Sequence, residues 1–416
     1  MGRDISDPHS QSPALTVGQR IRIARQRRGM SQEVLAGLMG KSPSWVRAVE
    51  SGSRQSDLRL SILLHLADAL QIENLSDLTG SQSVGLRMFT GPGHPALVEV
   101  RAAINAAPLL NSSEGQVHPL GVLRSRLDAA WRTRHASPDH RTALGRILPG
   151  LLRDVQCAVS TYPGGDRRRA NALLAEVYGL VQMYVAYQPA QDLLWRVADR
   201  ALLAAQESED PLAIGCAVWF LTQAHRDTGD FDAARDINEQ GIATLKPQLD
   251  SAGVDLLAMW GALHFELAFT AARLGAEGDA WRHWTAADRV AERLPPTYYN
   301  PVTSFSRVIM SAHAVTVAVE LSKGAESARQ SNNAEAFPIP SKPRRGRHLI
   351  EVARAHHLQR NHDAVLGTLQ LAHQTASETI RYNGFARRMV WELVDSGPSR
   401  LQGQVRELAV QIGLMA

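Results

Sequence analysis

The chain has 416 residues, 44% of them hydrophobic and 21% charged, which predicts a globular protein with two or more domains. The net charge is only +4, but residues 15–60 hold nine Lys or Arg and three acids, a local balance of +6. The rest of the chain therefore sums to −2. A basic segment of this kind is typical of a surface that binds nucleic acid.

We find no apolar run long enough to cross a bilayer and no secretion signal at the start of the chain. Cys157 and Cys216 lie far apart in apolar helical stretches, which is typical of reduced thiols in the cytosol. We therefore expect a cytoplasmic protein that does not enter a membrane.

Residues 1–14 are polar and are expected to be disordered. A first helix is predicted over residues 17–28. Ser31 is a good N-cap for a second helix, whose apolar stripe is Val34, Leu35, Leu38 and Met39. Gly40 follows where a helix needs a left-handed residue at its end.

Ser42 and Pro43 then start a third helix, with Pro43 at the position where a missing N–H has no cost. Val46 and Val49 are expected to face inward. Two helices joined by a short turn with glycine form a helix-turn-helix, whose second helix enters the major groove of DNA. An αα-hairpin that serves only for packing is the alternative.

The pattern SQ-x-x-LA-x-x-x-G-x-S-x-S-x-V-x-x-x-E-x-G, from Ser31 to Gly52, resembles the phage-repressor-type helix-turn-helix family, often called XRE. The resemblance implies a five-helix lambda-repressor-like domain over residues 15–80, with a fourth helix from about residue 60 and a short closing helix at 74–78. It also implies binding to double-stranded DNA, normally as a homodimer.

By the same resemblance, the start of the second helix and Gln32 contact phosphates, and the third helix faces the base edges. Arg47 is the best candidate for reading guanine, since its fork matches O6 and N7, but a phosphate contact alone remains an alternative. Trp45 belongs to the core or to a backbone contact. The predicted DNA-contacting residues are Arg25, Gln32, Lys41, Ser42, Pro43, Ser44, Trp45, Arg47, Ala48 and Arg54.

Residues 81–94 contain GPGHP and form the predicted linker. The remainder, residues 95–416, reads as consecutive helices without a strand signal, so the whole chain is assigned to the all-α class. Apolar stripes predict helices over 95–106, 119–135, 139–160, 166–187, 189–206, 211–228, 231–246, 252–274, 278–293, 303–322, 345–360, 362–376, 378–395 and 399–414.

Two segments share small residues at the same offsets, in GDFDAARDINEQGI from Gly229 and in GAEGDAWRHWTAADRV from Gly275. These offsets resemble the second half of a tetratricopeptide repeat, so residues 95–416 are expected to stack as an α-solenoid. The combination is similar to tetratricopeptide-bearing XRE regulators of high-GC Gram-positive bacteria. More distantly, it is like the RRNPP pheromone receptors, whose solenoid binds a short peptide.

In such solenoids the first helix of each pair lines the groove. The candidate ligand contacts are therefore Trp219, Gln223, Trp260, His264, Asn300, Arg307 and His313. Ordinary packing between helices is the alternative for the two i, i+4 pairs, Trp219 with Gln223 and Trp260 with His264. Asn300 could hold a peptide backbone.

No catalytic motif is found, so we expect neither an enzyme nor a cofactor. His348, His356, His357 and His362 could suggest a metal, but their spacing favours structural or solvent roles, and no metal is predicted. Residues 342–347, KPRRGR, are read as a solvated loop, with a nucleic-acid patch as the alternative.

The sequence therefore predicts a transcriptional regulator associated with the nucleoid, whose repeat domain senses a peptide, a small molecule or a protein. The alternative is a scaffold tethered to DNA that recruits a protein partner.

Overall fold

The computed structural model of the chain consists of helices joined by turns and loops, with no strand among the residues that it describes. These are residues 15–53, 58, 60–70, 72, 75–80, 93–106, 117–250, 253–333 and 339–415. The all-α class expected from the sequence is confirmed. The chain divides into two compact units, Met1–Leu86 and Arg87–Ala416, which we call the N-terminal unit and the helical unit.

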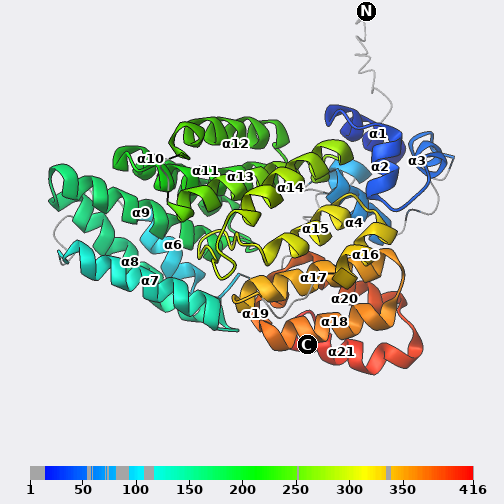
Figure 1. Cartoon of the computed structure of the whole chain (residues 1–416). Helices are drawn as coiled ribbons and strands as arrows, with labels where there is room; N and C mark the ends of the chain where they lie inside the picture. Colours follow the sequence, from blue (N-terminus) through cyan, green and yellow to red (C-terminus); the bar gives the residue numbers. More distant parts are fainter. Residues whose placement is uncertain are drawn as a thin grey trace, which may run out of the picture. The chain divides into compact units, whose positions relative to one another are not determined.

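The described part of the N-terminal unit forms helices around one core (Figure 1). Hydroxyls of Thr16, Ser31 and Ser42 each accept a hydrogen bond from an N–H in the first turn of α1, α2 and α3, which defines where these helices begin. The helices are α1 (Val17–Arg27), α2 (Gln32–Leu38), α3 (Pro43–Glu50), α4 (Leu60–Ala69) and α5 (Ser76–Thr79). Their core includes Ile21, Leu35, Val46, Val49, Leu66 and Leu78.

α1 and α3 approach each other so closely at Gly18 that no side chain fits between them. A Cβ added to Gly18 would lie 2.3 Å from the carbonyl oxygen of Val49. Because that neighbour is a backbone atom of α3, the two helices would have to move apart to admit even alanine. Gly18 therefore determines how closely α3 is held against α1.

The helical unit is built from helices that follow one another with short connections and pack in pairs, including α8 with α9, α11 with α12, α13 with α14 and α17 with α18 (Figure 1). Their bounds are α6 (Leu97–Asn105), α7 (Leu120–Ala136), α8 (His140–Thr161), α9 (Gly164–Val185), α10 (Gln191–Ser208), α11 (Pro211–Asp227), α12 (Phe231–Leu245), α13 (Val254–Arg273), α14 (Glu277–Glu292), α15 (Ile309–Glu320), α16 (Gly324–Asn333), α17 (Lys342–Leu358), α18 (His362–Thr375), α19 (Ser377–Tyr382), α20 (Gly384–Ser396) and α21 (Gln402–Gln411).

The two largest hydrophobic cores among the described residues of this unit differ in size. The larger core collects buried residues between Leu97 and Ile339, and the smaller one collects buried residues between Leu349 and Ile412. The two ends of the unit meet, because α17 contacts α7 and the carboxylate of Glu378 in α19 accepts hydrogen bonds from the start of α8. Side chains from helices of both cores therefore face a shared interior.

The small residues that suggested a repeat do allow close packing. Ala234 and Ala280 are fully buried, and a Cβ on Gly241 would lie 2.6 Å from Cγ1 of Val218. Gly229 and Gly275 adopt positive φ angles of 87° and 76°, each at the turn between two paired helices. These small residues allow the close helix packing that the resemblance to a tetratricopeptide repeat implies. The tetratricopeptide assignment itself stays a prediction.

Several predicted helix boundaries are wrong. The helix expected at 303–322 starts only at Ile309, because the Asn300 side-chain oxygen accepts from the N–H groups of Val302 and Thr303 and holds a turn there. Residues 378–395 form two helices, since Asn383 is extended and caps α20. α16 was missed because its sequence is almost entirely polar.

The segment 342–347 is not a solvated loop. Ser341 caps α17, Pro343 lies in its first turn, and the arginines that follow are part of the helix. Two of them, Arg344 and Arg347, turn towards the interior of the helical unit.

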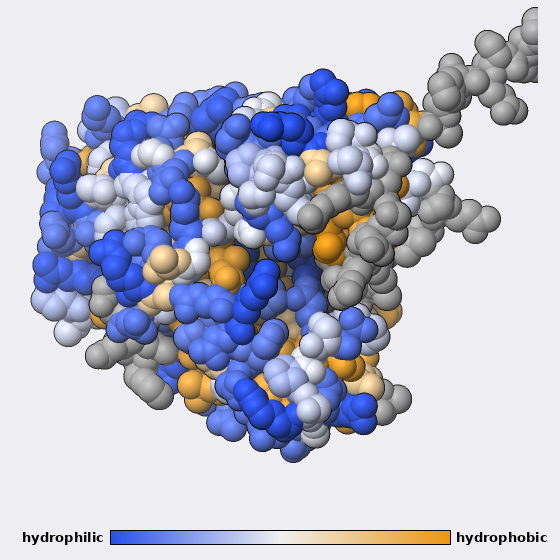
Figure 2. All heavy atoms as spheres, turned by 90° about the vertical axis from the view of Figure 1, so that its right-hand side faces the viewer, coloured by the Kyte–Doolittle hydropathy of each residue, from blue (hydrophilic) through white to orange (hydrophobic). Residues whose placement is uncertain are grey.

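The expectation that no segment could cross a bilayer also needs correction, because α13 is long and apolar enough by length and composition. α13 packs against α11, α12, α14 and α15, and 61% of its most apolar window is buried. This is the pattern of a core helix, whose apolar sides are covered by other helices. On the face drawn in Figure 2 the surface is mostly hydrophilic, with apolar side chains in separate small groups.

Candidate DNA interface and ligand cavity

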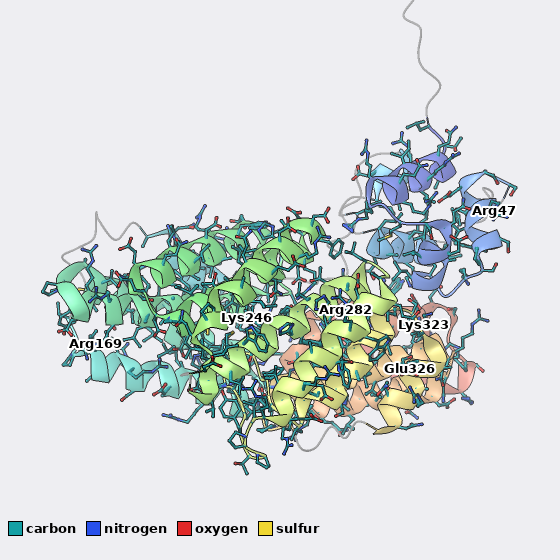
Figure 3. The ribbon with its side chains drawn as sticks, turned by 45° about the horizontal axis from the view of Figure 1, so that its top comes forward. Arg47, Arg169, Lys246, Arg282, Lys323 and Glu326 are labelled. Carbon is teal, nitrogen blue, oxygen red and sulfur yellow. The ribbon has the colours of Figure 1, made fainter. Side chains whose placement is uncertain are left out.

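α3 is anchored by one side and presents the other to solvent. Val46 and Val49 are each 1% exposed and belong to the core. The outer side carries the exposed side chains of Pro43, Ser44 and Arg47. Arg47 lies on the outside of α3 in Figure 3, and its guanidinium makes no hydrogen bond or ion pair with any residue that the structure describes. It is therefore available to an external partner.

The turn between α2 and α3 is tight and depends on one glycine. Gly40 has a φ of 59°, and the N–H of the next residue, Lys41, donates to the carbonyl of Ala36 at 2.9 Å. This closure satisfies a free carbonyl at the end of α2. The Lys41 ammonium then lies 5.9 Å from the centre of the Trp45 ring, at the edge of α3.

Arg25, expected to contact phosphate, has a different role. It is 8% exposed, and its guanidinium pairs with the Glu50 carboxylate through bonds of 2.5 Å and 3.0 Å. Its third nitrogen donates to the carbonyl of Met30 at 2.5 Å. The prediction for Arg25 is wrong for this conformation because all its donor groups are already used inside the domain.

Gln32 takes part in the same network, since its side-chain amide donates to Glu50 at 2.8 Å. The predicted phosphate contact through this side chain is therefore not supported. The network joins α1, α2 and α3 through one buried carboxylate. Its Arg25 partner and the Gln32 amide hold the pKa of Glu50 below its ordinary value against the opposing effect of burial.

Glu33 is an acid on the exposed start of α2. The pKa of its carboxyl is lowered mainly by backbone and Ser31 hydrogen bonds, with a smaller contribution from Arg47. Arg47 therefore acts on Glu33 only as a minor charge screened by solvent, and no ion pair joins the two side chains in the described structure.

Residues 16–74 match the family model of a helix-turn-helix domain. The match spans α1 to α4 and includes the turn and the exposed side of α3 described above. This domain binds DNA, and in such domains the second of the two helices enters the major groove. No curated protein matches the chain.

The predicted DNA contacts other than Arg25 and Gln32 differ in their positions. Lys41, Pro43, Ser44, Arg47 and Ala48 lie at least partly exposed on α3 or on the turn before it, whereas Ser42 uses its hydroxyl to cap α3. Trp45 is partly buried against the core, as the sequence suggested for it. Arg54 lies outside the described residues.

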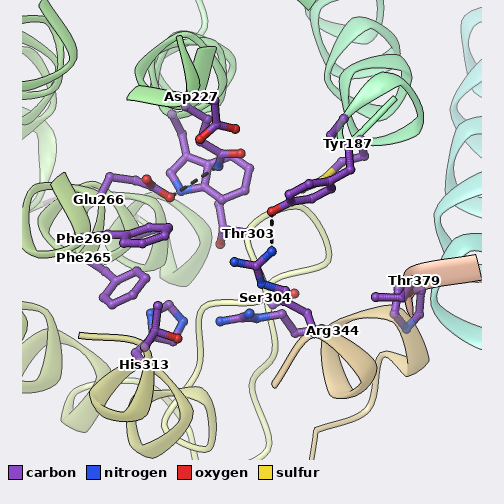
Figure 4. Close-up of a pocket in the computed structure, with 18 of the residues that line it drawn as sticks. Tyr187, Asp227, Phe265, Glu266, Phe269, Thr303, Ser304, His313, Arg344 and Thr379 are labelled. Atoms are coloured by element: carbon purple, nitrogen blue, oxygen red, sulfur yellow. Dashed lines mark hydrogen bonds between the residues drawn. The ribbon is translucent and has the colours of Figure 1, made fainter. Parts of the chain in front are cut away.

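The helical unit contains a cavity of about 210 Å³ (Figure 4). Its walls come from helices of both cores, α7, α8, α11 and α13 on one side and α17, α19 and α20 on the other. Aromatic side chains cover much of the wall, namely Trp219, Phe265, Phe269, Phe305 and Phe385. The charged lining is unequal, with arginines at 134, 141, 226, 273, 344 and 347 and acids only at Asp227 and Glu266.

Three of these arginines have acidic partners. Arg226 pairs with Glu266 inside the wall. Arg347 pairs with Glu351 at 2.7 Å and donates to the Tyr187 hydroxyl at 2.8 Å. Arg273 lies 3.5 Å from a carboxylate oxygen of Glu320.

The guanidinium groups of the other three form no ion pair with a carboxylate of the described residues, although the charge of Glu378 acts on Arg141 and that of Glu351 acts on Arg344. Arg134 approaches His135 and the sulfur of Met183, both at 3.4 Å, and lies 5.8 Å from the centre of the Trp131 ring. Arg141 donates to the carbonyl of Ala186 at 2.8 Å and approaches the His140 ring. Arg344 lies in the cavity in Figure 4 and makes no side-chain ion pair or hydrogen bond there.

Only some of the residues predicted to contact a ligand lie together at the cavity. Trp219, Gln223 and His313 line the cavity, whereas Trp260, His264, Asn300 and Arg307 do not. The Trp260 and His264 rings pack against each other with centroids 4.5 Å apart, which is the packing alternative for that pair. Asn300 is 3% exposed and stabilises its own turn, so it is not available to clamp a peptide, and Arg307 is exposed to solvent.

The buried ring of His264 should make the stability of the helical unit depend on pH. Burial lowers its pKa to about 4, and neither ring nitrogen has a hydrogen-bond partner. In the unfolded chain His264 binds a proton below about pH 6.5, whereas in the folded chain its ring stays neutral down to about pH 4. The free energy of unfolding that depends on the neutral ring is therefore present above pH 6.5 and is lost as the pH falls towards 4. We expect His264→Leu to remove up to about 2 kcal/mol of the difference in unfolding free energy between pH 7 and pH 5. Urea unfolding at both values measures it, and an unchanged difference would contradict the assignment.

The cavity arginines are what sequence reasoning missed. The basic run at 342–347 was noticed, but its periodicity did not show that Arg344 and Arg347 turn inward, because the helix was expected to start only at 345. No group of three or more metal-ligating side chains occurs among the described residues, including the stretch with His348, His356, His357 and His362.

Proposed function

We propose that the protein is an XRE-type, sequence-specific transcriptional regulator whose tetratricopeptide-like helical unit senses a ligand and controls DNA binding. One observation carries the proposal: Arg47 is exposed on the second helix of a matched helix-turn-helix motif, and its guanidinium forms no ion pair with any residue that the structure describes. The helical unit adds an interior cavity suited to a small molecule.

Base reading is assigned to the exposed side of α3. Arg47 donates to O6 and N7 of a guanine, because its planar fork matches these two acceptors. Ser44 and Ala48 lie beside it, while Pro43 has no side-chain donor and contributes apolar contact. Lys41, at the turn, binds phosphate and adds affinity that does not depend on sequence.

The protein acts as a homodimer on two half-sites, about one helical turn of DNA apart, as helix-turn-helix regulators of this geometry do. Because its partner is chromosomal DNA, we place the protein in the cytoplasm, on the nucleoid. A small molecule fits the sensor better than a peptide does, since the cavity is only about 210 Å³ and its walls come from both cores. Such a ligand changes DNA binding only if its affinity differs between two conformations of the unit.

Arg47→Ala tests the base-reading role in the full chain. We expect affinity for a duplex selected by the wild-type protein to fall by about 1–3 kcal/mol, because a bidentate base contact is lost. Affinity for random duplex falls much less, so discrimination between the two is reduced. Fluorescence anisotropy titrations at one fixed salt concentration measure both affinities.

Arg22→Ala is the matched control, because it removes the same charge from an exposed position on α1. This variant is expected to keep its preference for the selected duplex. If Arg47→Ala lowers binding to selected and random duplexes equally, Arg47 binds phosphate only. If it changes neither affinity, α3 does not carry the DNA contact.

A further inference from the structure

We propose that the cavity of the helical unit binds a small organic anion, whose carboxylate or phosphate group is held by Arg134, Arg141 and Arg344. The proposal names the ligand class for the sensing role given above and rests on that role for its biological meaning. Binding itself can be measured without DNA.

The first argument is charge balance. The described lining carries six arginines and two acids, and the guanidinium groups of the three arginines named above form no ion pair with a described carboxylate, only weaker attractions from Glu378 to Arg141 and from Glu351 to Arg344. Arg141 is only 4% exposed, and Arg134 and Arg344, which are partly buried, line the same cavity. Buried charges without partners are costly, and a bound anion would supply the missing partner.

The positive charges of Arg141 and Arg344 also act on the guanidinium group of Arg134. Arg134 has a pKa lowered to about 10, mainly by burial and further by the positive charges of Arg141 and Arg344. Burial likewise lowers the pKa of Arg344 and of Arg141. Arg141 and Arg344 are thus close enough to Arg134 to repel it, and an anion bound beside Arg134 would offset that repulsion.

Hydrogen-bonding capacity points the same way. The Nε atoms of Arg134 and Arg141 are buried and lack an acceptor. Planar guanidinium groups match the paired oxygens of a carboxylate or a phosphate. Donors that are left unsatisfied inside a protein are unusual and mark a place where an acceptor belongs.

The remaining side chains of the cavity wall indicate the size and polarity of the uncharged part of the ligand. Phe265 and Phe269 lie together on one side of the cavity in Figure 4, and Trp219 and Phe385 also line it. A cavity of about 150 Å³ accommodates benzene, so about 210 Å³ holds a compact molecule of roughly ten non-hydrogen atoms. An aromatic or branched apolar acid of that size fits both the charge and the wall.

The position of this site gives the anion a way to act on the fold. Arg134 and Arg141 come from α7 and α8, which belong to the larger core, and Arg344 comes from α17, which supports the smaller core. An anion that contacts all three favours the conformation in which these helices are close. That preference is the differential affinity that the sensing role requires.

The test uses the full chain without DNA. Phenyl phosphate and benzoate are the anionic probes, and benzamide is the neutral probe of the same shape. We expect at least one anion to bind saturably by isothermal titration calorimetry and to raise the unfolding temperature. Benzamide is expected to bind at least about tenfold more weakly, since it lacks the charge.

Arg344→Met and Arg134→Met are each expected to weaken anion binding by about tenfold or more while leaving the unfolding temperature of the ligand-free protein unchanged or higher. A purely structural arginine would lower that temperature instead. Arg307→Met is the control, because Arg307 is exposed and does not line the cavity.

The proposal is overturned if neither anion binds, if benzamide binds as tightly as the anions, or if both methionine variants bind like the wild type. These outcomes are independent of DNA selection by Arg47. Anion binding in a protein that selects no duplex would overturn the regulator role alone, and duplex selection without anion binding would overturn the ligand class alone.

Discussion

Glu50→Ala is expected to destabilise the N-terminal unit by about 3–5 kcal/mol, because it leaves a buried arginine without its partner. Glu50 and Arg25 are 6% and 8% exposed, and their two hydrogen bonds connect α3 to α1. The loss is large compared with the total stability of a domain this small. DNA binding should fall with it, since α3 loses its support.

Hydrogen exchange of the α1 to α3 amides, measured in the full chain, isolates this unit from the rest. The control is the double substitution Arg25→Met with Glu50→Leu, which removes both charges and is expected to recover most of the lost protection. If Glu50→Ala exchanges at the wild-type rate, the buried pair does not hold these helices together.

Glu378→Ala is expected to lower the stability of the helical unit by about 2–4 kcal/mol, because one carboxylate serves several buried donors. It accepts from the N–H groups of Arg141 and Thr142 at 2.5 Å and 3.1 Å, and from the Thr142 hydroxyl at 2.6 Å. Glu378 thus caps the start of α8 from a helix more than two hundred residues away in sequence. Without it, the two ends of the unit lose their main polar connection.

Chemical unfolding of the full chain, followed by circular dichroism, measures the effect. Glu378→Gln is the informative companion, because it keeps an acceptor but loses the charge that complements the start of the helix. The loss of unfolding free energy in Glu378→Gln should lie between zero and the loss in Glu378→Ala. Equal stability of the alanine variant and the wild type would show that the closure of the unit does not depend on this residue.

The helix-turn-helix could be predicted from the sequence because its determinants are local. Ser31 and Ser42 act within one turn of their helices, and Gly40 has the positive φ that its position implied. The role of Arg25 could not be predicted in the same way. Whether an arginine meets phosphate or a carboxylate depends on Glu50, twenty-five residues away, which helical periodicity does not place beside it.

For the helical unit, the sequence likewise predicted most helices but not how their side chains come together. Apolar stripes located most of its helices, but the cavity combines side chains from Arg134 in α7 to Phe385 in α20. No short window of sequence contains that arrangement. The candidate residues on α11 and α15, Trp219, Gln223 and His313, do line it, whereas Asn300 failed because its side chain serves its own turn.

The central claim is that α3 reads a DNA sequence. The most direct measurement is selection of duplexes from a random pool by the full-length protein, followed by affinities for the selected and unselected duplexes at several salt concentrations. We expect a selected sequence to be bound about a thousandfold or more tightly than random duplex at physiological salt. Equal affinity for all duplexes at every salt concentration would contradict it.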